Sequence, residues 1–73
     1  MGSPDRNRFG MRIRQLRLAR GWTQDELAEQ TGLHATYVGS VERGERNLGF
    51  DNLLKIARAF GEHPAALFAD FQK

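Results

Sequence analysis

The sequence has no cysteine, which excludes disulfide bonds and thiolate metal sites. It has no apolar run approaching the roughly 20 residues of a membrane-spanning helix. It also has no apolar core of a signal peptide after its first residue. We therefore expect a cytoplasmic protein without a membrane partner. The 73 residues leave room for one domain with one modest hydrophobic core.

Residues suited to catalysis are also scarce. His34 and His63 are the only histidines, and neither has a partner at the spacing of a metal site or a catalytic triad. The chain has no glycine-rich phosphate-binding loop. The sequence therefore predicts that the protein is not an enzyme, and that it binds no metal, cofactor or small-molecule ligand.

Charge is the first positive indication of a partner. The net charge is only +2, but the sequence pI of about 9.7 lies in the range typical of nucleic-acid-binding domains. Nine of the eleven basic residues are Arg, whose planar fork suits phosphate and base contacts. Most of the Arg residues near the start are expected only to solvate one helix. The full set near the start is Arg6, Arg8, Arg12, Arg14, Arg17 and Arg20.

Apolar spacing and helix-end signals predict an all-α fold, with no stretch that alternates as a β-strand does. Phe9, Ile13 and Leu16 form one helical stripe. Thr23 and Glu26 fit a capping box at the start of a second helix. We expect a compact five-helix bundle made of residues 7–20, 24–31, 35–43, 50–60 and 64–71. Residues 7–73 would form the single domain, and residues 1–6 a disordered tail or a remnant that is not native.

The stretch from residue 24 to residue 43 has the pattern of a helix-turn-helix. Ala28 is a small residue where one helix passes close to the next, and Gly32 suits the left-handed conformation that ends a helix. Val38 and Val41 follow at the spacing of a second buried helix face. Two short helices joined by such a turn form the unit that places a helix in the DNA major groove.

Three segments carry a family resemblance over residues 9–68. They resemble the lambda-repressor and Cro type (XRE-like) helix-turn-helix domain. The three segments are T-Q-D-E-L-A, G-L-H-A-T-Y-V-G-S-V-E-R-G-E-R-N and L-L-K-I-A-R-A-F-G. The second segment also resembles the small controller proteins of restriction–modification systems. The resemblance implies a transcription regulator that binds double-stranded DNA as a homodimer, on a two-fold symmetric or nearly symmetric operator.

The resemblance implies that the start of the helix at 35–43 enters the major groove. Thr36 and Ser40 have hydroxyl groups that can donate to or accept from a base, with ordinary exposed helix surface as the less favoured alternative. Ala35 departs from relatives, which commonly have a long polar side chain there. The expected base-edge contacts are His34, Ala35, Thr36, Gly39 and Ser40. Because Ala35 cannot form two hydrogen bonds to guanine, we also expect DNA shape and Arg residues outside this helix to contribute to specificity.

Phosphate contacts are expected at helix ends and in the loop after residue 43. Free amides and the helix dipole at Gln24 favour an anion, and Tyr37 can either reach the DNA backbone or pack its ring inward. The full set is Gln24, Tyr37, Arg43, Arg46 and Asn47, with a solvated loop as the alternative for the last two.

Two further sets are assigned to structure and assembly. In relatives an Arg late in the first helix pairs with the Glu of the E-R-G segment, which implies a structural ion pair between Arg17 and Glu42. The dimer interface is expected at Leu48, Leu67, Phe68 and Phe71; of these, Phe68 is expected to face the core and Phe71 to be the better interface candidate.

Two other functions remain open at the level of sequence. The protein could be an antitoxin or prophage-type repressor that also binds a protein partner. It could also be an interaction module that binds no DNA, in which case salt-sensitive binding to duplexes would be absent.

Overall fold

The computed structural model describes residues 3–69 and 71, which form four α-helices and one short 3-10 helix. The elements are α1 (Pro4–Ala19), α2 (Gln24–Thr31), α3 (Ala35–Glu42), α4 (Phe50–Phe60) and η1 (Pro64–Phe68). No strand occurs among these residues, which confirms the all-α class. Within the same part of the chain, no helix is long and apolar enough to cross a membrane.

Helix α1 begins at Pro4, one turn earlier than expected. The Ser3 hydroxyl accepts a hydrogen bond from the Arg6 amide at 3.1 Å and caps the helix. Pro4 lies in the first turn, where a helix tolerates proline, and Asp5 adds a favourable negative charge there. The serine–proline start signal therefore overrides the expected boundary, and residues 4–6 belong to α1 rather than to a tail. Residues 1 and 2 lie outside the described part.

The fifth element differs from the prediction, so the bundle has four α-helices and not five among the described residues. Residues 64–68 form a 3-10 helix, and the segment does not continue as a helix to Phe71. The Ala66 amide donates to the His63 carbonyl at 2.8 Å, which is the tighter three-residue pattern. One fully buried side chain, Leu67, anchors this turn to the core.

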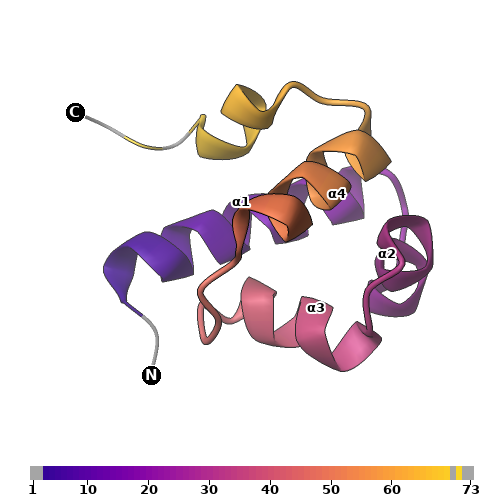
Figure 1. Ribbon diagram of the computed structural model, residues 1–73, viewed down its shortest axis with the longest axis horizontal. Helices are drawn as coiled ribbons and strands as arrows, with labels where there is room; N and C mark the ends of the chain where they lie inside the picture. The colour runs from indigo at the N-terminus through magenta and orange to yellow at the C-terminus, as the bar shows by residue number, and fades with distance from the viewer. Residues whose placement is uncertain (1–2, 70, 72–73) are drawn as a thin grey trace.

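The hydrophobic core draws on all five elements. Figure 1 shows α2 and α3 together at one end of the molecule, with η1 at the other side of α4. Gly10 is where α1 meets α3, because a Cβ atom there would lie 2.8 Å from the Glu42 carbonyl carbon. The largest fully buried side chains of the core are Ile13, Leu27, Val38, Ile56 and Leu67.

Candidate nucleic-acid interface

Local sequence signals position α2 and α3 as expected for a helix-turn-helix. Both halves of the capping box are present, since Thr23 and Glu26 exchange hydrogen bonds of 2.8 and 3.1 Å. Gly32 ends α2 with φ at +75°, in the left-handed region that favours glycine. The tight turn then leads directly into α3, which starts after His34.

The start of α3 presents two of the expected base-contacting residues to solvent. His34 and Thr36 are exposed, whereas Ala35 is partly buried and packs against the core. The Ala35 methyl group therefore contributes partly to packing within the monomer and is only partly available to DNA. Thr36 offers the free hydroxyl and methyl group in the first turn of this helix.

Ser40 is not available for a base contact. Its residue is only 6% exposed, and its hydroxyl donates to the Tyr37 carbonyl at 2.7 Å. The chain after α3 turns back, and the Glu45 amide donates to the Ser40 carbonyl at 2.9 Å. We therefore remove Ser40 from the set of base-contacting residues, because burial and an internal partner leave its hydroxyl without an outward role.

Gly39 leaves room for two long side chains. A Cβ atom at this position would lie 3.2 Å from Arg43 Nη1 and 3.3 Å from Gln24 Oε1. Arg43 therefore extends back along α3, over the glycine, instead of pointing away from the helix end. The absence of a side chain at position 39 allows this arrangement.

A buried ion pair joins α1 to the end of α3, as expected for Arg17 and Glu42. Arg17 Nε donates to Glu42 Oε2 at 2.7 Å and Nη2 donates to Oε1 at 3.1 Å. Arg17 Nη1 also donates to the Trp22 carbonyl at 2.7 Å. The two side chains are 9% and 3% exposed, so they face the protein and not a ligand.

Gln24 extends this buried network and is less free than expected. Its Nε2 donates to Glu42 Oε1 at 3.1 Å, and the residue is half-buried. The side chain is therefore held toward α3, in a position that leaves its Oε1 beside Gly39. The start of α2 still offers a partial positive charge to an anion.

A second, exposed ion pair lies immediately beyond α3. Arg43 Nε donates to Glu45 Oε2 at 3.0 Å and Nη2 donates to Oε1 at 3.1 Å, with 58% and 46% of the two side chains exposed. The hydrogen bonds to Glu45 raise the pKa of Arg43, and the same bonds from Arg43 lower the pKa of Glu45. Glu45 was absent from the residues expected at the site. The only signal for it was its place two residues after Arg43.

The loop that follows provides the remaining polar contacts. The Arg46 guanidinium lies over the Tyr37 ring, 5.9 Å from its centre. The Tyr37 hydroxyl accepts from Asn52 Nδ2 at 3.1 Å, a contact that the sequence did not indicate. Tyr37 is thus half-buried between the loop and α4, while Arg46 and Asn47 are exposed.

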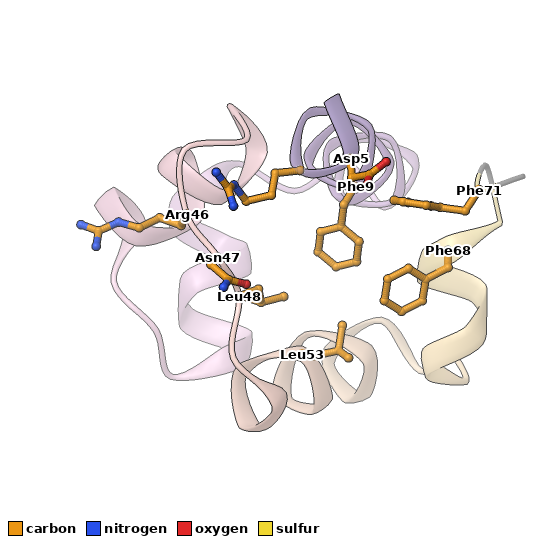
Figure 2. A pocket seen from close by; sticks show the side chains of 9 residues that line it. Asp5, Phe9, Arg46, Asn47, Leu48, Leu53, Phe68 and Phe71 are labelled. Atoms are coloured by element: carbon orange, nitrogen blue, oxygen red, sulfur yellow. The ribbon is translucent and has the colours of Figure 1, made fainter. Parts of the chain in front are cut away.

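An open apolar cleft of about 210 Å³ lies beside this loop, between the start of α1, the loop, α4 and the C-terminal segment. Figure 2 shows Phe9, Leu53 and Phe68 pointing into it. The Phe68 ring lies 5.2 Å from Phe9 and 5.5 Å from Phe71, measured between centres. The other residues that line the cleft are Asp5, Arg6, Arg46, Asn47 and Leu48.

The cleft changes the expected set of interface residues. Leu67 is completely buried and belongs to the monomer core, so its place in the dimer interface was wrong. Phe68, expected to face the core, is 40% exposed. Phe50 was missed altogether and is 72% exposed, one turn before the cleft-lining Leu53 on α4. It was missed because the helical pattern of α4 places it at the edge of the apolar stripe.

Comparison with known proteins gives consistent results in sequence and structure. The Helix-turn-helix family profile matches residues 13–67. The chain belongs to the helix-turn-helix family of DNA-binding transcription regulators. The crystal structure of the restriction-modification controller protein C.AhdI from Aeromonas hydrophila matches with a TM-score of 0.89 and 47% identity. That match covers 90% of this chain and all of C.AhdI.

Two curated relatives extend this similarity. Control protein C.BamHI from Bacillus amyloliquefaciens is 43% identical over 60 residues, which are 81% of this chain and 74% of the relative. Control protein C.MunI from Mycoplasma sp is 37% identical over 67 residues, 90% of both chains. The similarity to small controller proteins therefore spans nearly the whole molecule.

Proposed function

We propose that this helix-turn-helix protein is a controller-type transcription regulator that binds a two-fold symmetric DNA operator as a homodimer in the cytoplasm. The observation that carries the proposal is the exposed start of α3, where His34 and Thr36 project to solvent directly after the tight turn that ends α2. Similarity to control proteins over most of the chain supports the same function. An exposed helix of this kind fits the DNA major groove.

Basic and polar groups around α3 suit the DNA backbone. Arg46 and Asn47 are exposed beyond the helix, and the start of α2 at Gln24 carries the positive end of a helix dipole. Tyr37 lies beneath Arg46 and holds the loop against α4 through Asn52. We assign phosphate contacts to Arg46, Asn47 and the start of α2, and a supporting role to Tyr37.

The apolar cleft is the surface we assign to dimerisation. Phe68 and Phe71 border a cleft that one small domain leaves open, and Phe50 adds an exposed aromatic side chain one turn from it. Burying aromatic area of this kind is typical of interface centres. A two-fold dimer would then bind half-sites about 10–10.5 base pairs apart.

Selection of binding sites from random duplex DNA at two salt concentrations tests the proposal. We expect an enriched two-fold symmetric site and an affinity that falls as salt rises. Failure to enrich any sequence, with circular dichroism showing a folded protein, would contradict it and favour a protein-interaction module. Capture of a stable partner encoded beside the gene, together with DNA binding, would instead favour the antitoxin or prophage-type repressor.

Sedimentation analysis of Phe68→Ser tests the dimer surface separately. We expect weaker self-association than in the unchanged protein, whereas Leu18→Ser, which replaces a 54% exposed apolar residue on α1, should have no effect. Equal sedimentation of both variants and the unchanged protein would show that the cleft is not the interface.

A further inference from the structure

We infer that Arg43, which follows the last residue of α3, lies over Gly39 and is held by Glu45, recognises guanine in place of the long side chain that Ala35 lacks. This inference rests on the proposed DNA-binding function and names a specificity determinant for it. It differs from the phosphate contact expected for Arg43 from the sequence.

Arg43 leaves the end of α3 on the same side as Thr36. Thr36 and Arg43 are seven residues apart, two helical turns, so their side chains leave α3 on the same side. The Arg43 guanidinium does not continue past the helix end, because its Nη1 lies 3.2 Å from where a Cβ of Gly39 would be. The charge is therefore brought back over Gly39, one turn from the exposed Thr36.

Arg43 keeps a pair of N–H donors that its bonds to Glu45 do not use. Its bonds to Glu45 use Nε and Nη2, the side edge of the guanidinium. An Arg side chain has five N–H donors, so an Nη1–H and the second Nη2–H remain at the end of the group. These two parallel donors match the O6 and N7 acceptors of guanine in the major groove.

Glu45 can hold the Arg43 guanidinium in place. The two-point contact fixes the plane of the guanidinium, and the shifted pKa values of both residues show that each stabilises the charged form of the other. Glu45 is itself fixed, because its amide donates to the Ser40 carbonyl and Gly44 before it takes φ +77°. Glu45 is thus a positioning residue for Arg43.

A comparison of four variants by site selection and by titration of the selected duplex tests this inference. Arg43→Lys keeps the charge but loses the planar fork, so nonspecific binding should be retained. Discrimination for one G·C pair in each half-site should fall by about 5- to 150-fold. Arg43→Gln should lose the same discrimination and also bind all sequences more weakly.

Glu45→Gln separates a positioning role from a simple charge effect. We expect it to lose part of the discrimination at the same G·C pair while nonspecific affinity rises, since one negative charge has been removed. Glu62→Gln is the matched control: it makes the same charge change at the Arg20–Glu62 pair, where the 3.5 Å contact lies beside Phe60 and away from α3. Its preferred site should be unchanged.

Three results have distinct meanings. If Arg43→Lys keeps the selected site and only Arg43→Gln weakens binding uniformly, Arg43 contacts phosphate and the inference is wrong. If Glu45→Gln raises affinity for specific and nonspecific duplexes equally, Glu45 competes with DNA for Arg43 and does not position it. If the unchanged protein selects no sequence, the proposed function itself fails, and the inference fails with it.

Discussion

Two Arg–Glu pairs lie at the end of α3, and they differ in how far their side chains are exposed to solvent. Arg17 and Glu42 are almost completely buried, whereas about half of each side chain in the Arg43–Glu45 pair is exposed. Both use the same two-point geometry, with Nε and Nη2 on the two carboxylate oxygens. The difference in burial separates a pair that holds α1 to α3 from a pair that lies at the surface, where the remaining Arg43 donors can reach DNA.

Burial also decides what each pair contributes to folding. A buried charge that loses its partner cannot be solvated, so breaking the pair is costly even where forming it adds little net stability. An exposed pair is screened by water and salt, and its loss is nearly neutral for folding. The comparison therefore predicts opposite effects of similar substitutions only a few residues apart.

The largest expected effect is on the buried pair. Glu42→Gln leaves the Arg17 charge without its partner and should lower the free energy of unfolding by about 3–5 kcal/mol. Urea denaturation measures this loss. The double variant Arg17→Met with Glu42→Leu should regain much of it, because no charge then remains buried. A loss below about 1 kcal/mol for Glu42→Gln would contradict a structural role for the pair.

The next largest effect on stability is expected at Gly10, which packs against the backbone of Glu42. Gly10→Ala places a methyl group 2.8 Å from the Glu42 carbonyl carbon, where backbone atoms must shift. We expect a loss of about 1–3 kcal/mol in the free energy of unfolding, as for overpacked sites. Thermal unfolding of the variant provides the measurement. Unchanged stability would mean that α1 and α3 can separate without cost.

Gly39→Ala is the corresponding glycine substitution beside the exposed Arg43–Glu45 pair. Alanine favours the helix by about 1 kcal/mol, while the new methyl group meets only the flexible ends of Arg43 and Gln24. The free energy of unfolding should therefore change by no more than about 1 kcal/mol. Discrimination at the selected G·C pair should fall, because Arg43 is displaced. Retained discrimination, measured by competition between duplexes, would show that Arg43 does not need this space.

The smallest effect is the pH dependence of the exposed pair. Arg43 lowers the pKa of Glu45, so the contribution of this pair is present above the ordinary carboxylate pKa and is lost as pH falls through the lowered value. The midpoint for the Glu45 carboxyl carbon, followed by NMR, should rise in Arg43→Gln. Because both groups are exposed, no measurable change in unfolding is expected. An unchanged midpoint would mean that the pair does not persist in solution.

The sequence predicted the parts of the fold that local signals determine. Helices α2 and α4 begin and end at the expected residues, because a capping box, Gly32 and Gly61 define their ends. The signals at Ser3 and Pro4 were equally present but were assigned to a tail. The fifth helix was wrong because one buried residue, Leu67, needs only a single tight turn.

The site was harder to predict because it depends on the path of the chain after α3. Ser40 has the spacing of an exposed residue, but the returning loop covers it. The turn at Gly44 brings Glu45 to Arg43, and no spacing rule for helices or strands anticipates this contact. Burial of Leu67 and exposure of Phe50 and Phe68 likewise depend on how α4 and η1 meet α1.

The most direct test is to follow the Arg Nε–H signals by NMR while the protein is titrated with its selected duplex. We expect a large shift for Arg43, which faces the DNA, and almost none for Arg17, which remains in its buried pair. A large shift for Arg17 with an unmoved Arg43 would contradict the division between a structural pair and a recognition pair.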